Sequence, residues 1–184
     1  MQVHELKENV TREALEKRIE KHKPALIAFN GHGSPDCITG DNLEILVKAG
    51  ENENILQSAI VHSLSCSSAS ILGPRSVKAG AKAFIGYNQD FVLLHSEDRS
   101  TTPKKDRIAE HFLTAANLAP ISLIKGNTVQ DAYEKSQAAY EKSIEYYMTH
   151  YTPQNSHILF WLRYNKTIQE IHGAKNATLI SCQS

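Results

Sequence analysis

The chain has 184 residues, of which 41% are hydrophobic and 22% are charged. These proportions are typical of a globular domain with a sizeable core. Twenty Lys and Arg residues balance twenty Asp and Glu residues, which argues against the strongly basic surface that nucleic acids and anionic membranes attract.

No stretch resembles a secretory leader or a membrane span, so we expect a cytoplasmic protein without a membrane partner. Cys37, Cys66 and Cys182 are an odd number of cysteines and contain no CxxC pair, which argues against a disulfide framework or a zinc site. The nine histidines show no HExxH or similar ligand spacing. We therefore expect neither a metal nor a cofactor.

The predicted elements alternate between strands and helices along the chain. The first half is predicted to contain a weak edge strand at 1–6, a helix at about 11–21, a strand at 25–29, a short helix at about 41–50 and a strand at 58–65. The second half is predicted to contain a short helix at about 74–80, a strand at 82–87, helices at about 104–116 and 128–148, and strands at 157–164 and 167–171. Such alternation predicts one α/β domain, residues 1–184, with a mostly parallel sheet and helices on both faces.

Side-chain patterns support several of these helices. Thr11 and Thr128 are good N-cap residues for the helices that follow them, and Asp41 to Glu44 has the spacing of a capping box. Tyrosines recur at helical spacing along 128–148, which indicates ordinary packing rather than a cofactor wall.

A histidine and a cysteine follow the first two strong strands. The strand at 25–29 ends in Asn-Gly-His-Gly, which contains His32, and the strand at 58–65 ends at Cys66. Parallel neighbours joined by a crossover point the same way, so both residues are expected at the carboxyl edge of the sheet, where open α/β sheets place their sites. Because neighbouring strands lie about 4.8 Å apart, the two side chains can approach each other.

A thiol and an imidazole in this arrangement suit nucleophilic catalysis. The imidazole of His32 can accept the proton of the Cys66 thiol and later give it to a leaving amine. Gly33 has no side chain, so its N–H and that of Cys66 can both face a tetrahedral oxyanion. Loss of one such donor costs roughly 3 kcal/mol of transition-state stabilisation.

Simpler interpretations exist for these residue types. A cysteine at the end of a buried strand is often a small core side chain. Cys37 follows no predicted strand, and we treat it as incidental. His62 lies roughly 13 Å from Cys66 along an extended chain, too far for direct proton transfer, and is expected to be a core or rim histidine.

The ordered motifs resemble the caspase–gingipain–clostripain superfamily of cysteine peptidases. They are an apolar strand ending in "NGHG", a strand ending in "LSCSSAS", then "LG…VKAGAKAFIGY" and the tail "WLRYNKTIQEIHGAKNATL". The chain is most similar to the prokaryotic branch that includes CHAT domains. The resemblance implies a three-layer α/β/α caspase–haemoglobinase fold and peptide-bond hydrolysis by a His–Cys dyad. It assigns His32 as general acid/base, Cys66 as nucleophile and Gly33 to the oxyanion hole.

The start of the chain departs from the pattern of that superfamily. Its members usually begin with a central strand and a helix ahead of the segment at which this chain opens. We therefore expect a sheet that lacks its first strand, with the chain as a fragment of a longer protein or with a partner chain or further domain completing the sheet. A catalytically degenerate fold that acts as an interaction module remains the alternative.

The resemblance also places the pocket for the residue before the scissile bond. It implies Ser65, Asn88 and Asp90 as substrate-binding candidates, and Asp36 is a weaker acidic candidate. A desolvated carboxylate at Asp90 favours a substrate Arg or Lys, whereas a solvated loop carboxylate has no such role. A third hypothesis, in which "GHGS" cradles the anion of a small molecule, lacks a supporting GxGxxG motif.

Overall fold

The sheet of this protein has four strands. The computed structural model describes residues 2–96 and 106–179. The strand order is β1-β4-β5-β6, with bounds Leu26–Asn30, Ile60–Leu64, Ala83–Tyr87 and Gln169–Gly173. β1, β4 and β5 run parallel, and β6 is antiparallel to β5. The predicted α/β fold with a mostly parallel sheet is therefore confirmed.

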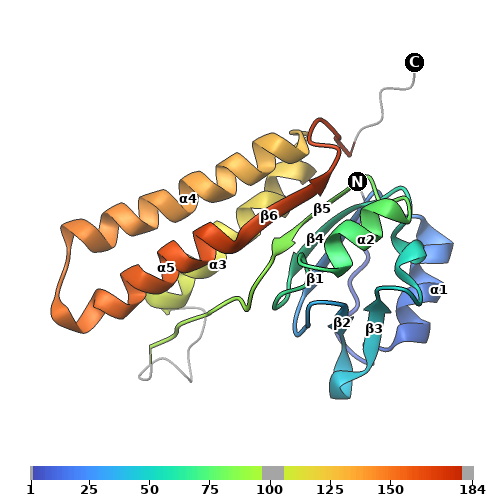
Figure 1. Cartoon of the computed structure of the whole chain (residues 1–184), viewed down its shortest axis with the longest axis horizontal. Coiled ribbons are helices and arrows are strands. Elements are labelled where there is room, and N and C mark those ends of the chain that lie inside the picture. The colour runs from blue at the N-terminus through green and yellow to red at the C-terminus, as the bar shows by residue number, and fades with distance from the viewer. Residues whose placement is uncertain (1, 97–105, 180–184) are drawn as a thin grey trace.

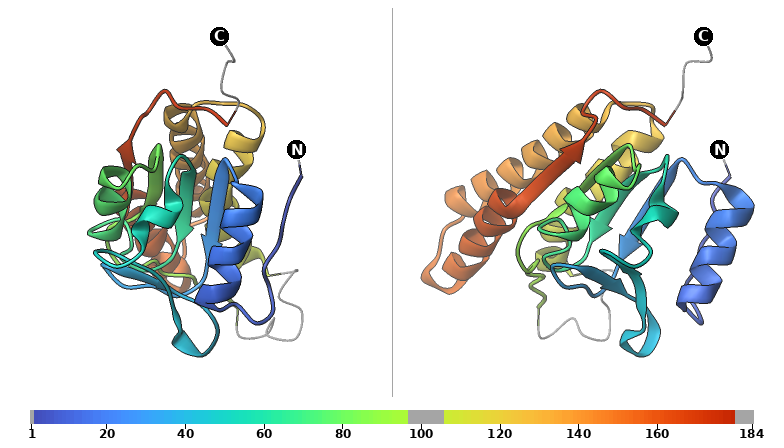
Figure 2. Two further views of the ribbon diagram at one scale, coloured as in Figure 1. Left: turned by 90° about the vertical axis from the view of Figure 1, so that its right-hand side faces the viewer. Right: turned by 45° about the vertical axis from the view of Figure 1, so that its right-hand side comes forward.

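Helices cover both faces of this sheet (Figures 1 and 2). One face carries helices α1 (Arg12–His22) and α2 (Leu72–Lys78) and the antiparallel pair β2 (Cys37–Thr39) and β3 (Ile45–Lys48). The other face carries α3 (Arg107–Ile124) and α4 (Val129–Thr149). Helix α5 (Ser156–Ile168) packs beside α4 and leads into β6. Short 3-10 turns occupy Asp41–Leu43, Glu53–Leu56 and Pro153–Asn155.

The central strand β4 shows why the sheet is buried on both faces. Val61 packs into the core beneath α1 and α2, whereas Ile60 packs into the core beneath α3 and α4. Both side chains have no exposed surface. A parallel strand covered on both sides is apolar at successive positions, which explains why the runs at 25–29, 58–65 and 82–87 predicted β1, β4 and β5 correctly.

Two predicted N-caps are confirmed. The Thr11 hydroxyl accepts a hydrogen bond from the Ala14 N–H at the start of α1. Thr128 and Asp131 form a reciprocal capping box at the start of α4. The tyrosines of α4 pack as expected, since Tyr140 is fully buried.

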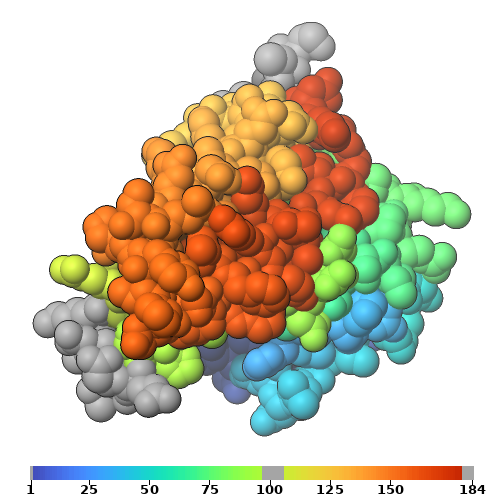
Figure 3. All heavy atoms as spheres, turned by 60° about the vertical axis from the view of Figure 1, so that its left-hand side comes forward, coloured from blue at the N-terminus to red at the C-terminus, as the bar shows by residue number. Residues whose placement is uncertain are grey.

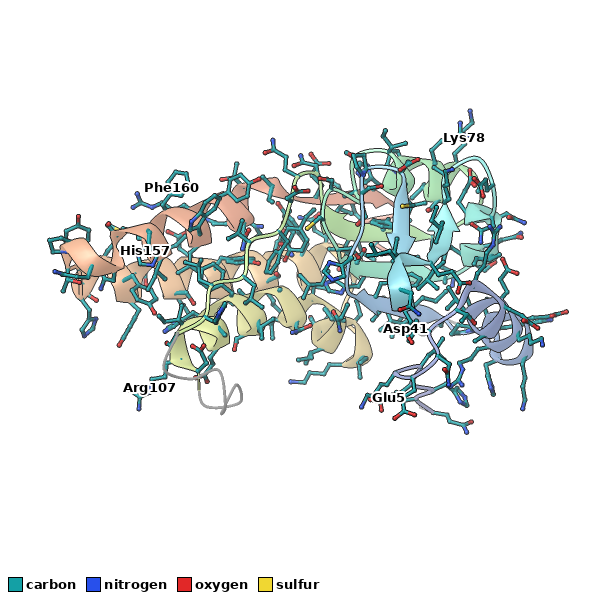
Figure 4. All side chains as sticks on the ribbon, turned by 90° about the horizontal axis from the view of Figure 1, so that it is seen from below. Glu5, Asp41, Lys78, Arg107, His157 and Phe160 are labelled. Atoms are coloured by element: carbon teal, nitrogen blue, oxygen red, sulfur yellow. The ribbon has the colours of Figure 1, made fainter. Side chains whose placement is uncertain are left out.

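The predicted helix at 41–50 is wrong. A single 3-10 turn begins at Asp41 and strand β3 follows it, so the crossover between β1 and β4 is the β2–β3 pair rather than a helix. The two acidic side chains that resemble a capping box instead bind the start of α1 and the residues just before it: Asp41 accepts from the Val10 N–H at 2.9 Å and Glu44 from the Arg12 N–H at 2.8 Å. Figure 4 labels Asp41, which lies beside that segment.

The predicted strand at 157–164 is also wrong, because this segment forms helix α5. Its buried residues Ile158, Leu162 and Asn165 follow the spacing of a helix face. Residues 2–11 form no strand, contrary to the edge strand expected at 1–6. The helix expected at about 104–116 is longer than predicted, since α3 continues through Pro120 to Ile124.

Strand β1 forms one edge of the sheet. Among residues 2–96 and 106–179, no strand pairs with its outer side. The expectation that a partner or further segment completes the sheet stays a prediction. In the same ranges, no helix combines the length and apolar character that a membrane crossing requires.

The helical layer extends past the sheet. Figure 1 shows α4 and α5 running together beyond the ends of the strands, and Figure 3 shows them forming one continuous surface. His157 and Phe160 are exposed near the far end of this helical pair (Figure 4). The other end of α5 reaches the segment that follows β5, where the candidate site lies.

Candidate active site

His32 and Cys66 occupy matching places on neighbouring parallel strands. Asn30 at the end of β1 pairs with Leu64 at the end of β4. The Gly31 N–H extends this pairing by donating to the Leu64 carbonyl at 3.2 Å. His32 and Cys66 are each the second residue beyond the Asn30–Leu64 pair, so the register brings both to the carboxyl edge of the sheet.

Gly33 packs directly against the backbone around Cys66. A Cβ atom at Gly33 would lie 2.8 Å from the Ser65 Cβ, 3.0 Å from the Cys37 carbonyl oxygen and 3.2 Å from the Cys66 carbonyl oxygen. Contacts this short leave no room for a side chain. The absence of a side chain at Gly33 therefore allows the histidine turn to approach the cysteine turn.

Backbone donors are available beside the thiol. Gly33 and Ile38 form an antiparallel bridge whose bonds run from Ser34 N–H to the Cys37 carbonyl and from Thr39 N–H to the His32 carbonyl. Within residues 2–96 and 106–179, neither the Gly33 N–H nor the Cys66 N–H donates to a backbone oxygen, and the Cys66 N–H interacts with its own sulfur. Two N–H groups without a backbone acceptor, on the histidine turn and the cysteine turn, match the donor set of an oxyanion hole.

The Cys66 thiol is half-buried and neutral in character. Burial raises its pKa, the backbones of Phe91 and of Cys66 itself offset part of this rise, and the nearby Asp90 carboxylate adds to it. The sulfur lies 3.9 Å from the Phe91 carbonyl oxygen, which accepts the thiol hydrogen. This conformation therefore holds a protonated thiol rather than a preformed thiolate.

The His32 side chain is exposed at the same edge. Among the described residues it makes no hydrogen bond, ion pair or ring contact. Its imidazole is therefore free to turn toward Cys66 or toward a bound molecule, and apo sites often form their catalytic hydrogen bonds only with substrate in place.

The substrate-binding candidates lie in different surroundings. Ser65 is buried, and its hydroxyl pairs with the Ser63 hydroxyl at 2.9 Å. The Asn88 side chain points to β6, where its amide donates to the Glu170 carboxylate. Asp90 is exposed and accepts from the Ser67 hydroxyl at 2.7 Å. Of these three candidates, Asp90 is therefore the one that is exposed and whose carboxylate raises the pKa of the Cys66 thiol.

Cys37 and His62 are buried in the fold. Cys37 is buried in β2 with its sulfur 3.2 Å from the Ser34 hydroxyl, and the same hydroxyl donates to Asp36 at 2.8 Å. Cys182 lies outside the described residues. His62 is fully buried in β4, as the core interpretation expects.

His62 lacks a partner of good geometry in this core. Neither ring nitrogen makes a hydrogen bond among the described residues. Burial lowers its pKa to about 4, and the Ala116 backbone partly offsets the shift. Pro120 has no N–H to donate to the Ala116 carbonyl, so that carbonyl is released from the helix ladder on the side of the imidazole.

Sequence reasoning missed the segment that covers the thiol. Phe91 acts through its backbone carbonyl, and no side-chain pattern reports such a role. Asn165 binds both backbone groups of Val92. Its signal in the sequence is a polar residue at a buried helix position, which becomes visible only once 157–164 is recognised as a helix.

No group of three or more His, Cys, Asp or Glu side chains able to hold a metal occurs in residues 2–96 and 106–179. A groove of about 740 Å³, lined by α1 and by residues ahead of β1, β4 and β5, lies at the opposite edge of the sheet. Comparison with protein-family models, curated proteins and solved structures finds no match to this chain. The geometry of the site therefore carries the functional argument.

Proposed function

We propose that the protein is a cysteine endopeptidase of the caspase-like type, with His32 and Cys66 as its dyad. The observation that carries this proposal is the matched register of β1 and β4, which leads an imidazole and a thiol to one sheet edge. The close approach of Gly33 to Cys66 supports it. A caspase–haemoglobinase fold is part of the same proposal, and the helices on both faces of the sheet are compatible with it.

The proposed reaction begins with transfer of the thiol proton from Cys66 to His32. The sulfur attacks the carbonyl carbon of the scissile peptide, and the N–H groups of Gly33 and Cys66 stabilise the resulting oxyanion. The oxyanion collapses, the C–N bond breaks, and His32 gives its proton to the leaving amine. A water molecule, deprotonated by His32, then hydrolyses the thioester and restores the thiol.

Because the Cys66 thiol is protonated in the free protein, the proposed reaction has to begin with removal of its proton. Because the pKa of Cys66 is raised by burial, we propose that His32 removes the proton when substrate is bound. A permanent thiolate–imidazolium pair is not part of this mechanism. The free surface of the His32 side chain is consistent with an imidazole that moves into place.

Asp90 supports a substrate preference for the proposed peptidase. Asp90 is exposed in the free protein and acts electrostatically on Cys66; a bound peptide would shield this carboxylate from water, and a cationic side chain before the scissile bond would then pair with it. We therefore propose cleavage after Arg or Lys. Asp90→Asn should reduce the preference for these residues over neutral ones, and an unchanged preference would show that Asp90 is only a solvated loop carboxylate.

A peptide electrophile that reacts with thiols tests the activity. The wild type should be labelled, whereas Cys66→Ala should not, and Cys37→Ala is the matched control that keeps the labelling. Labelling of Cys66→Ala at the wild-type rate would place the reactive thiol elsewhere.

Two observations favour a second candidate function. The raised pKa of Cys66 and the unpartnered His32 also suit a fold that has lost catalysis and serves as an interaction module. For such a module, peptide electrophiles should react no faster with Cys66 than simple alkylating agents do. Acceleration by a peptide that occupies the site would exclude it.

A further inference from the structure

A short segment after β5 crosses the candidate nucleophile. We call residues 89–92 the covering segment. The Ser67 N–H donates to the Gln89 carbonyl at 3.0 Å, and the Ser67 hydroxyl donates to Asp90 at 2.7 Å. The Phe91 carbonyl accepts the Cys66 thiol at 3.9 Å. Three successive residues of the covering segment therefore contact the cysteine turn.

Helix α5 holds the covering segment from its other side. The Asn165 side-chain amide donates to the Val92 carbonyl at 2.7 Å, and its oxygen accepts the Val92 N–H at 3.1 Å. Asn165 has no exposed surface. The Tyr164 hydroxyl donates to the Gln89 side chain at 3.2 Å. Asn165 thus satisfies both backbone groups of Val92, as a neighbouring strand would.

We propose that Asn165 is a positioning residue that, through Val92, keeps the Phe91 carbonyl against the Cys66 thiol and so holds the nucleophile in a closed resting form. The inference rests on the proposed function in taking Cys66 as the nucleophile. Burial is the largest cause that raises the pKa of the Cys66 thiol and so favours its neutral form, whereas the Phe91 backbone by itself acts to lower that pKa. The thiol therefore becomes reactive when the covering segment moves, and substrate binding at this edge supplies that movement.

The substitution Asn165→Asp tests this role with little change of shape. When ionised, the new carboxyl group still accepts the Val92 N–H but has no hydrogen for the Val92 carbonyl; when protonated it can donate to that carbonyl, so the comparison with the wild type is made at the alkaline end of the pH profile. Ser136→Ala is the matched control, because it removes another buried hydrogen bond, from its hydroxyl to the Ala115 carbonyl at 2.7 Å. Ser136 lies on α4 and makes no hydrogen bond to the covering segment.

The probe is iodoacetamide, with the modified cysteine assigned by peptide mass mapping. Asn165→Asp should raise the alkylation rate of Cys66 at the alkaline end of the pH profile by about two- to tenfold, the range expected for loss of one hydrogen bond. It should also shift the pH profile of alkylation to lower pH. Ser136→Ala should lower thermal stability without either change.

A wild-type rate and pH profile for Cys66 in folded Asn165→Asp would overturn the proposal and leave Asn165 a purely structural residue. If Asn165→Asp does not fold, Asn165→Leu removes both hydrogen bonds to Val92 without a buried charge and should raise the rate in the same direction; an unchanged rate would again overturn the proposal. Alkylation needs no peptide hydrolysis, so this result and a failure of the peptidase assignment are distinguishable.

Discussion

His32 and Cys66 stand at equal distances beyond a paired position of two parallel strands, since each is the second residue after the Asn30–Leu64 pair. Their position at one edge of the sheet follows from strand register rather than from nearness in the sequence. Slipping one strand by one residue would move its side chains to the other face of the sheet. The relationship therefore depends on the apolar pattern of β1 and β4.

Gly33→Ala should disturb this relationship. The new Cβ would lie 2.8 Å from the Ser65 Cβ and 3.0 Å from the Cys37 carbonyl, so the two turns must separate. We expect the free energy of unfolding to fall by about 1–3 kcal/mol, and peptide cleavage to fall with it. Chemical denaturation and a cleavage assay measure the two effects.

Gly31→Ala is the matched control for that change. Its Cβ would meet nothing closer than the Thr39 carbonyl at 3.8 Å, and an alanine keeps the N–H that binds Leu64. Stability and cleavage should therefore remain near those of the wild type. Equal losses in the two variants would show that the approach of Gly33 to Cys66 has no special role.

His62 should make the fold sensitive to acid. Its pKa is lowered to about 4 from a usual value of 6.5, so the folded state disfavours the proton that the unfolded state accepts. Stability is lost as the pH falls below about 6.5 and continues to fall until about 4. Between pH 7 and pH 5 the loss should be about 2 kcal/mol.

Urea denaturation of His62→Leu at these two pH values isolates this contribution. The variant should lack the part of the acid sensitivity that His62 causes, and it should be no less stable than the wild type at neutral pH, because it replaces a buried imidazole whose ring nitrogens make no hydrogen bond of good geometry. His157→Leu, at an exposed site on α5, should keep the wild-type dependence. An unchanged pH dependence in His62→Leu would contradict the account of this core.

The sequence predicts the sheet better than it predicts the connections. Continuous apolar runs identify β1, β4 and β5, because strands buried on both faces need no alternation. The same kind of run at 157–164 forms a helix, since a short apolar run does not by itself distinguish the two structures. Asp41 and Glu44 imitate a capping box, yet they bind the amides of Val10 and Arg12, which only the folded chain brings near.

The candidate site, too, is only partly predictable from the sequence. Its side-chain chemistry is readable, because His32, Gly33 and Cys66 follow recognisable strands. The contact of Cys66 with the Phe91 carbonyl is not readable, because it depends on how Asn165, 73 positions along the chain from Val92, packs against the covering segment. Backbone groups leave no pattern in a sequence.

A buried hydroxyl pair should tie α4 to the sheet. The Tyr87 and Tyr140 hydroxyls lie 2.9 Å apart, and the Gln169 side chain donates to Tyr87 at 3.4 Å. Tyr140→Phe should lower the free energy of unfolding by about 1–2 kcal/mol, because Tyr87 loses its nearer partner. Tyr151→Phe, at an exposed position, should have no effect in the same denaturation experiment, and equal stability of both variants would contradict this link.

Peptide cleavage by the wild type, Cys66→Ala and His32→Ala, followed by mass spectrometry on a mixed peptide library, tests the dyad most directly. The account predicts cleavage by the wild type, none by Cys66→Ala, and a rate lower by about 10²–10⁴-fold in His32→Ala. Undiminished cleavage by Cys66→Ala, or a wild type that cleaves no peptide, would contradict it.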